Sequence, residues 1–242
     1  MPRKPRSQSG SGVHHTYIRG VNRQCIFDAD EDFDRFLRHA RNAAQHSRVT
    51  ILAYCLMSNH AHMIVEQGHE PLGIFFQRLG ATYANWFNRK YDRVGHLWQD
   101  RFGSRPVEDS NDLINVIRYV HANPVAEGLC TSSAQYPWSS ARGDSQVAHT
   151  PRTMELTGVA EWSELATAPI LAPPLPGESP RRTLSDQSVR DLITAITGTA
   201  NMSAFQRLDQ STQNTAITRA RAAGASTRQL ARITGLTRGR FI

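Results

Sequence analysis

The 242-residue chain carries a formal net charge of +7, and 39% of its residues are hydrophobic. This length allows one substantial core and one smaller unit, and the positive charge favours an anionic partner. No apolar run approaches about 18 residues, and the basic N-terminus has no apolar segment. We therefore expect neither a membrane span nor a secretory signal.

The positive charge is concentrated at the two ends of the chain. Residues 1–23 contain five Arg or Lys and no acidic residue, and residues 181–242 contain ten Arg against three Asp. Such segments are typical of arms that hold a polyanion by its phosphates. The alternative is that these charges serve only solubility. The near absence of acidic residues at both ends argues against it, because a surface that is charged for solubility usually carries both signs.

The three cysteines, Cys25, Cys55 and Cys130, form no CxxC pair. Their number and spacing predict neither a zinc ribbon nor a disulfide framework, which indicates a reducing compartment. Because the basic ends favour a polyanion such as a nucleic acid, we expect a cytoplasmic protein that is associated with the nucleoid.

The hydrophobic pattern predicts strands that alternate with helices in the first part of the chain. Residues 1–12 are rich in Pro, Arg, Ser and Gly and are typical of a disordered arm. The predicted elements are, in chain order, a strand from His14 to Arg19, a helix from Asp28–Glu31 to about Ser47, strands at 49–56 and 60–66, a helix at 72–91, an irregular strand at 95–107, and a helix from Asp109 or Ser110 that Pro124 ends or kinks.

This order predicts an α+β fold. The first six elements match the ferredoxin-like split arrangement, an antiparallel sheet with helices on one face, and the other face is then open to a ligand. We assign residues 1–12 to a basic arm, 13–142 to this domain, 143–183 to an irregular linker and 184–242 to a small basic helical region.

The end of the chain has the pattern of a helix-turn-helix. Residues 226–241 show a Ser/Thr cap, a short helix, a glycine turn and a second, Thr-capped basic helix. The alternative is a basic helical hairpin that reads no bases.

The stretch MSNHAHMIV, residues 57–65, places His60 and His62 one residue apart in an apolar, β-branched run. Side chains i and i+2 of a strand point to the same face. The two imidazoles would therefore lie side by side, as a divalent metal site needs. The alternative is two polar residues on the wet face of a half-buried strand.

The stretch RYVHANPV, residues 118–125, places Tyr119 and Asn123 one helical turn apart on one face, while His121 points elsewhere. If this face meets the strand of the histidine pair, two imidazoles, an amide oxygen and a phenol converge. A phenol attacks only after losing its proton, and its ordinary pKa is about 10. A metal ion that polarises the phosphate makes attack by the phenol easier, because it stabilises the charge that develops in the transition state. The alternative is a tyrosine of the core or its rim.

These motifs together resemble a known family. MSNHAHMIV, GHLWQDRF (95–102) and RYVHANPV, in this order and spacing, are similar to the single-tyrosine HUH transposases of the IS200/IS605 type, and in particular to their REP-associated tyrosine transposase branch. RGVNRQCIF (19–27) and YPWSS (136–140) also resemble that branch. The similarity covers residues 13–140.

The resemblance implies a ferredoxin-like nuclease that binds hairpin DNA and cuts and rejoins the single strand with Mg²⁺ or Mn²⁺. Cleavage leaves a 5′-phosphotyrosine link and a free 3′-OH. His60 and His62 match the metal ligands, Asn123 matches the third ligand and Tyr119 matches the nucleophile. The REP-associated branch is expected to act as a monomer, whereas members of the wider family form dimers that exchange tyrosine helices.

Two positions depart from the family pattern. Ala61 between the histidines is small for a hydrophobic slot, and Val21 stands where the branch often has asparagine, so the DNA contact there is expected to differ. Basic residues are expected to hold phosphates, and aromatic residues are expected to stack on unpaired bases. Core packing is the alternative for Trp98 and Phe102. The predicted DNA-binding residues are Arg3, Lys4, Arg6, Arg19, Asn22, Arg23, Trp98, Arg101, Phe102, Arg228, Arg232 and Arg238.

Two other functions compete with a transposase. One is a domesticated protein that binds hairpins without cutting them, and the intact site residues argue against it. The other is an HUH replication initiator or relaxase, which the single tyrosine and the short domain disfavour.

Overall fold

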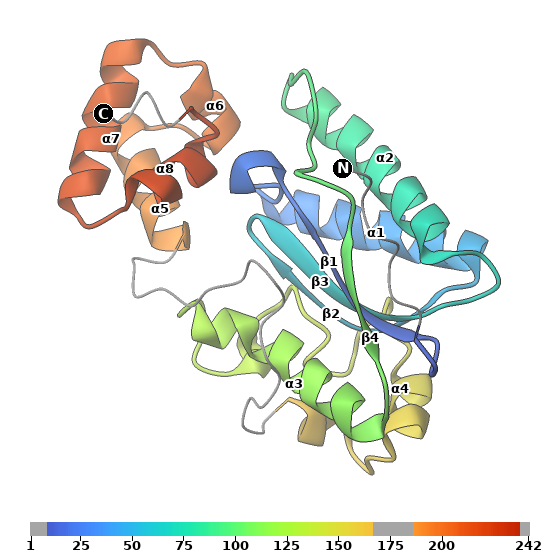
Figure 1. Cartoon of the computed structure of the whole chain (residues 1–242). Helices are drawn as coiled ribbons and strands as arrows, with labels where there is room; N and C mark the ends of the chain where they lie inside the picture. The colour runs from blue at the N-terminus through green and yellow to red at the C-terminus, as the bar shows by residue number, and fades with distance from the viewer. Residues whose placement is uncertain (1–8, 167–185, 238–242) are drawn as a thin grey trace, which may run out of the picture.

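The computed structural model describes residues 9–166 and 186–237, which form two packed units (Figure 1). The larger unit is an antiparallel sheet of four strands with helices on both faces, and the smaller unit consists of α5 to α8. No helix in these two ranges is long and apolar enough to cross a membrane.

The sheet has the strand order of the predicted fold. It contains β1 (Val13–Arg19), β2 (Thr50–Met57), β3 (His60–Glu66) and β4 (Gly103–Val107), in the spatial order β2-β3-β1-β4. All three pairs are antiparallel, and the first and third strands lie in the middle. This is the ferredoxin-like arrangement, so the predicted α+β class is confirmed.

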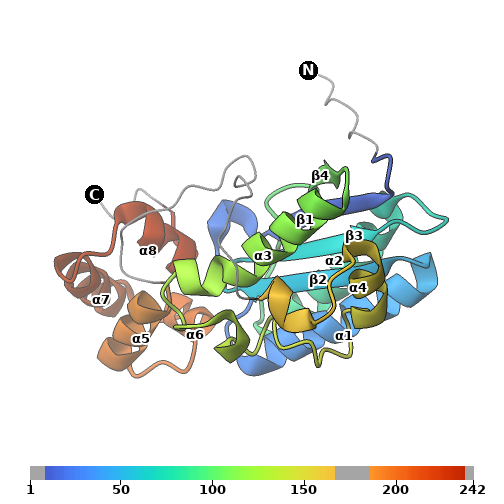
Figure 2. The same ribbon diagram turned by 90° about the horizontal axis from the view of Figure 1, so that it is seen from below.

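Helices cover both faces of this sheet. The helices α1 (Asp30–Ser47) and α2 (Leu72–Lys90) pack on one face, and α3 (Ser110–Ala126) and α4 (Thr150–Thr157) pack on the other. Figure 2 shows α1 and α3 on opposite sides of the strands. The expectation of one open face is therefore wrong for most of the sheet.

The physical reason is the apolar side of α3. Leu113, Ile117 and Val120 are buried there against the sheet, in one cluster with Ala53 and Ile64. An amphipathic helix must bury this side, and the uncovered face of the sheet is the nearest apolar surface. Asp109 begins the helix by accepting a hydrogen bond from the Asp112 amide (2.8 Å).

The helix α3 continues past the predicted break at Pro124. It ends at Ala126, so the proline lies in its last turn, where the loss of one backbone N–H interrupts little of the helix. Tyr119 and Asn123 thus belong to one uninterrupted helix.

Part of the predicted linker packs on the domain. Residues 143–166 contain α4 and a short 3₁₀ turn, η3 (Trp162–Leu165). The Thr153 hydroxyl donates to the Leu52 carbonyl (2.9 Å), and Trp162 is buried in the cluster under α3. The packed unit therefore extends beyond residue 142, while residues 167–183 of the predicted linker and 1–8 of the predicted arm lie outside the described residues.

The segment YPWSS also lies against the sheet. It follows another 3₁₀ turn, η2 (Ser133–Gln135). The Tyr136 hydroxyl donates to the Leu56 carbonyl (2.7 Å), and the Trp138 carbonyl accepts from the Leu56 amide (2.9 Å). These bonds satisfy the outer edge of β2, so the segment acts as a cover for that edge.

The smaller unit has its own apolar core. It contains α5 (Asp186–Thr197), α6 (Met202–Gln206), α7 (Gln210–Ala222) and α8 (Thr227–Thr234). Its most deeply buried residues are Val189, Ile193, Phe205, Ala216, Ala220 and Leu230.

The helix α8 corresponds to the first helix of the predicted helix-turn-helix. Ser226 caps it by accepting a hydrogen bond from the Gln229 amide (3.1 Å), and Gly235 ends it at φ 69°. Glycine adopts this left-handed conformation without steric cost. The second predicted helix, residues 238–241, lies outside the described residues.

A buried arginine joins the two units. Arg190 of α5 pairs with Asp28 (3.3 Å), donates to the Phe27 carbonyl (2.8 Å) and approaches the Cys25 sulfur (3.1 Å). Burial raises the pKa of Cys25 to about 11, so this group is a neutral thiol. Asp28 is thus the charge that balances Arg190, and its other oxygen accepts from the Met202 amide (2.9 Å).

Replacing Arg190 with Met should weaken the contact between the two units. The change leaves the Asp28 carboxylate buried without its partner, and breaking a buried pair in this way costs about 3–5 kcal/mol. The loss of unfolding free energy would be measured by urea titration, with limited proteolysis of the smaller unit as the probe of its unfolding. Arg207→Met, at an exposed position of the same unit, is the control, and equal stability of the two variants would contradict the assignment.

Candidate active site

The sheet brings the histidine pair to the face that α3 covers. His60 and His62 alternate with Ala61 on β3, and their direct partners on β1 are Arg19 and Tyr17. His62 is fully buried, whereas His60 is only partly buried. The rings lie edge to face, with centroids 4.9 Å apart. The prediction that both imidazoles share one face is therefore supported by the geometry.

The orientation of the His60 ring depends on Asn59. The Asn59 amide nitrogen donates to the Arg23 carbonyl (3.1 Å), which fixes its oxygen as the atom 2.6 Å from His60 Nδ1. Because an amide oxygen can only accept, Nδ1 must carry the proton. The coordinating nitrogen of His60 is then Nε2, as in metal sites where a second group orients the ligand.

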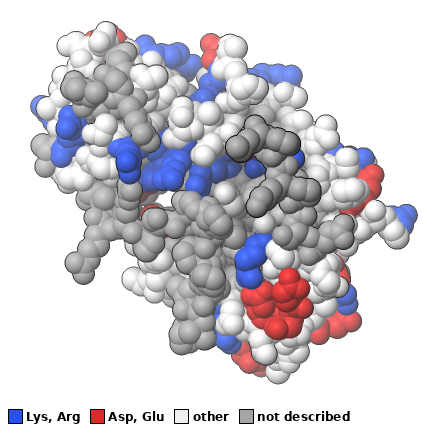
Figure 3. Space-filling view, in the orientation of Figure 1, with Lys and Arg blue, Asp and Glu red and all other residues white. Residues whose placement is uncertain are grey.

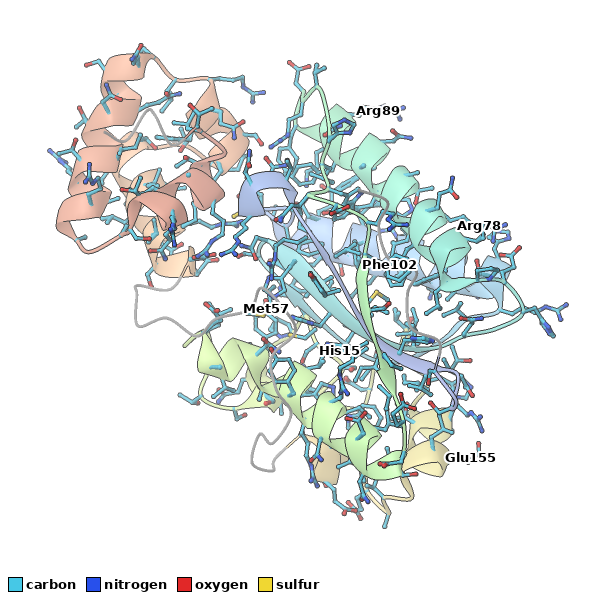
Figure 4. The ribbon with its side chains drawn as sticks, in the orientation of Figure 1. His15, Met57, Arg78, Arg89, Phe102 and Glu155 are labelled. Atoms are coloured by element: carbon cyan, nitrogen blue, oxygen red, sulfur yellow. The ribbon has the colours of Figure 1, made fainter. Side chains whose placement is uncertain are left out.

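A third histidine supports His62. His15 of β1 is buried, and its Nε2 lies 3.1 Å from Nδ1 of His62. Its ring centroid lies 5.2 Å from that of His62 and 6.0 Å from that of Tyr119 (Figure 4 labels His15). The sequence did not indicate a role for His15. Only the strand register shows that His15 on β1 is the diagonal neighbour of His62 on the adjacent strand β3.

Tyr119 of α3 faces the same histidines. Its ring centroid lies 6.2 Å from that of His62, with the planes at 85°, and its side chain is partly buried. One turn later, the Asn123 amide nitrogen donates to the Tyr119 carbonyl (2.9 Å). The amide oxygen of Asn123, the atom that a metal would need, takes no part in this bond. The structure therefore brings Tyr119 to the predicted pair, with Asn123 on the same helix.

The donor types on these elements are compatible with a divalent cation. No group of three or more His, Cys, Asp or Glu side chains is placed to hold a metal in the described ranges. A site here would consequently need the amide oxygen of Asn123 beside Nε2 of His60 and of His62. Two oriented imidazoles and an amide oxygen leave positions for phosphate oxygens and water, which Mg²⁺ and Mn²⁺ prefer.

His121 lies away from this site, as the helical spacing predicts. It is fully buried, with Nε2 2.9 Å from the Ser140 hydroxyl and Nδ1 3.2 Å from the Leu165 carbonyl. Burial lowers its pKa to about 4, so it is a neutral residue of the core.

The predicted DNA-binding residues of the first loop lie at the exposed end of the site. The Arg19 guanidinium lies 5.4 Å from the centre of the Tyr17 ring, opposite His60 on β1. Asn22 and Arg23 belong to the 3₁₀ turn η1 (Val21–Arg23) and are exposed. Both have positive φ values, 52° and 59°.

The aromatic residues that were predicted to stack on DNA pack in the core of the opposite face. The Trp98 indole donates to the Gly80 carbonyl (2.8 Å), and the buried Phe102 ring stacks on Phe76 with centroids 4.1 Å apart (Figure 4). Both contact the cluster under α1 and α2. The structure favours the core-packing alternative for these two residues, because their rings fill the gap beside α2. Arg101 next to them is exposed.

The remaining predicted residues differ in their surroundings. Arg228 is exposed on α8, whereas Arg232 pairs with Asp186 of α5. Arg3, Lys4, Arg6 and Arg238 lie outside the described residues.

Comparisons with known proteins find similarity to transposases. Residues 11–123 match the family model described as "Transposase IS200 like". A Haemophilus influenzae protein named "Putative REP-associated tyrosine transposase" is 24% identical over 115 residues, which are 43% of this chain and 65% of that protein. The chain thus spans just under two thirds of the length of this curated relative.

A solved structure has the same fold. The structure titled as a REP-associated tyrosine transposase bound to a REP hairpin superposes with a TM-score of 0.54 at 18% identity, covering 74% of this chain and 98% of that one. The sheet, the histidine pair and the helical tyrosine all lie within the residues that match the transposase family model. Residues 11–123 are thus similar to the IS200-like transposase family, in agreement with the resemblance seen in the sequence.

Replacing Asn59 with Ala should release the His60 ring from its tautomer. In the metal-free protein we expect the Nδ1–H form of His60, because the Asn59 oxygen accepts that proton. Imidazole nitrogen shifts measured by NMR would report the tautomer. In Asn59→Ala the Nδ1–H signature should weaken. The control Asn85→Ala, at an exposed position of α2, should leave it unchanged. An unaltered His60 signature in Asn59→Ala would contradict this role.

Proposed function

We propose that this chain is a metal-dependent transposase and single-strand endonuclease that binds hairpin DNA and cleaves and rejoins it through Tyr119. The observation that carries the proposal is the position of Tyr119. Its ring centroid lies 6.2 Å from that of His62, and it belongs to the same helix as Asn123. The relative named as a REP-associated tyrosine transposase and the similar structure bound to a REP hairpin support the substrate class.

The proposed chemistry is a transesterification in which Tyr119 replaces a deoxyribose oxygen. The Tyr119 hydroxyl loses its proton and its oxygen attacks the phosphorus, while the bond from phosphorus to the 3′ oxygen breaks and that oxygen takes up a proton. The products are a 5′-phosphotyrosine and a free 3′-OH. Attack of a 3′-OH on this link reverses the step and joins two strands.

The residues around Tyr119 have distinct proposed roles. His60, His62 and Asn123 would hold Mg²⁺ or Mn²⁺, which supplies Lewis-acid stabilisation of the charge on the phosphate. Asn59 and His15 orient the two imidazoles. Arg19, which lies beside Tyr17 and opposite His60, would hold a DNA phosphate next to the reacting one.

A monomer is the proposed active form. Tyr119 and the histidine pair come from the same chain, and α3 packs on the sheet of its own domain. A second copy is therefore not needed to complete the site. Light scattering during cleavage would test this, and activity confined to a dimer would contradict it.

Tyr119→Phe should abolish covalent attachment and leave DNA binding unchanged. The variant removes one oxygen from a partly buried ring, so the packing of α3 should persist. Incubation with single-stranded hairpin DNA from the flanks of the gene and Mn²⁺, followed by a denaturing gel, would detect the adduct. Tyr17→Phe, beside His62 on β1, is the matched control and should still form it. An adduct with Tyr119→Phe would exclude this residue as the nucleophile.

Asn59→Ala should bind Mn²⁺ about 10- to 100-fold more weakly, because partners that orient a metal ligand typically contribute that much. Isothermal titration of the metal into the DNA-free protein measures the affinity. Asn59→Asp keeps an acceptor for His60 Nδ1 and should recover part of the loss. Identical titrations for wild type and Asn59→Ala would contradict the proposed metal site.

The second candidate function is a domesticated protein that binds hairpins without cutting them. The presence of His60, His62 and Tyr119 together, with Asn123 one turn after Tyr119, favours the enzyme. Binding that needs no metal, together with no nicking in Mn²⁺ across many hairpins, would favour the domesticated protein.

A further inference from the structure

We infer that η1 (Val21–Arg23) and α8 (Thr227–Thr234) form one basic surface that binds the phosphate backbone of the duplex stem of a DNA hairpin. This η1–α8 surface joins two segments that lie about 200 residues apart in the sequence. The inference rests on the proposed function, since it assigns a second contact area for the same DNA.

The two segments are in direct contact. The helix α8 packs against η1, and a Cβ atom added at Gly235, at its end, would lie 3.7 Å from the side-chain oxygen of Gln24. Cys25 belongs to the apolar core of the C-terminal helices. The buried Arg190–Asp28 pair holds the same loop from the side of α5. The two segments therefore keep a fixed relative position, as a surface for a rigid ligand requires.

The exposed charges of this surface are positive. Arg23 and Asn22 are exposed on η1, and Arg228 is exposed on α8. Two nearby carboxylates are balanced, Asp28 by Arg190 and Asp186 by Arg232. A third, the exposed Glu127, lies near Arg232 rather than near η1. Figure 3 shows blue atoms in a band across the junction of the two units, with little red beside them. Such a band attracts a polyanion over its whole length.

The backbone of η1 is held in an unusual conformation. Asn22 and Arg23 are consecutive non-glycine residues in the left-handed region, which stores strain of the kind found at ligand-binding sites. The Arg23 amide donates to the Gly20 carbonyl (2.9 Å), and its carbonyl accepts from Asn59 (3.1 Å). The strained turn is thereby attached to the residue that orients His60.

This attachment places the η1–α8 surface directly beside the proposed cleavage site. A strand that reaches Tyr119 is unpaired, but the adjoining stem of a hairpin remains a duplex and cannot enter a site covered by α3. It needs a contact outside the site that is broad and rigid. Two basic elements fixed side by side at the exposed end of the histidine pair supply such a contact, and phosphates of the stem are the matching ligand.

The test uses the full chain with Arg23→Asn, Arg228→Ala and the double variant. Asparagine tolerates the left-handed conformation of residue 23, so the first change removes the charge without adding strain. Arg41→Ala, exposed on α1 at the opposite face of the sheet, is the matched control. The probes are a hairpin with a stem of about ten base pairs, one helical turn, and an unpaired strand of equal length.

We expect each surface variant to weaken hairpin binding and to lower the slope of log K against log salt by about 0.9, and the double variant by about 1.8. Arg41→Ala should leave affinity and slope unchanged, and the unpaired strand should lose little affinity with any variant. Hairpin binding by the double variant equal to that of Arg41→Ala would overturn the inference. So would an equal loss on the unpaired strand, because the contact would then not be with the stem.

Failure of this inference is distinguishable from failure of the proposed function. If wild type forms the Tyr119 adduct while the double variant keeps full hairpin affinity, only the η1–α8 surface is excluded. If wild type neither binds hairpins nor forms an adduct, the proposed function fails and this inference fails with it.

Discussion

The antiparallel pairing of β1 with β3 is the constraint on which both units depend. It sets Tyr17 opposite His62 and Arg19 opposite His60, and it places His15 where it can orient the His62 ring. A shift of one residue would turn every one of these side chains to the face of α1 and α2. The same pairing brings the end of β1 beside the start of β3, where Gly20 donates its amide to the Asn59 carbonyl (3.0 Å).

That end of the pairing is also where the two units meet. The chain leaves β1 through Gly20, at which a Cβ atom would lie only 2.4 Å from the Gln24 carbonyl oxygen, so no larger residue fits the turn. The turn then presents Cys25 and Asp28 to the C-terminal helices, and the Arg23 carbonyl to Asn59. Hydrogen bonds thus connect the docked C-terminal unit, the strained turn and the His60 ring. The C-terminal helices can therefore influence the orientation of His60 through this chain of hydrogen bonds, although none of them contributes a residue to the candidate site.

Local patterns were informative wherever a side chain's role depends on its near neighbours in sequence. The His60/His62 spacing and the Tyr119/Asn123 spacing each predicted a shared face, and His121 was correctly placed on another side of α3. Trp98 and Phe102 show the opposite case. Their aromatic and basic neighbours matched a stacking surface equally well, and only the contacts of the segment before β4 with α2 showed that both rings face the core. The covered face of the sheet was missed for the same reason, since no periodicity says which surface an amphipathic helix will meet.

The sequence by itself determined the element order, the antiparallel α+β class, the motif residues and the basic ends, because periodicity and spacing act over a few residues. Tertiary structure alone decided that His15 and Asn59 orient the two histidines, that residues 143–166 belong to the packed domain, and that Arg190 joins the C-terminal helices to the turn after β1. His15 and His62 lie 47 positions apart, and Arg190 and Cys25 lie 165 positions apart. Asn59 is adjacent to His60, but its side chain is held by the Arg23 carbonyl 36 positions away. The formation of these contacts depends on strand register and on the burial of charge, which no local pattern encodes.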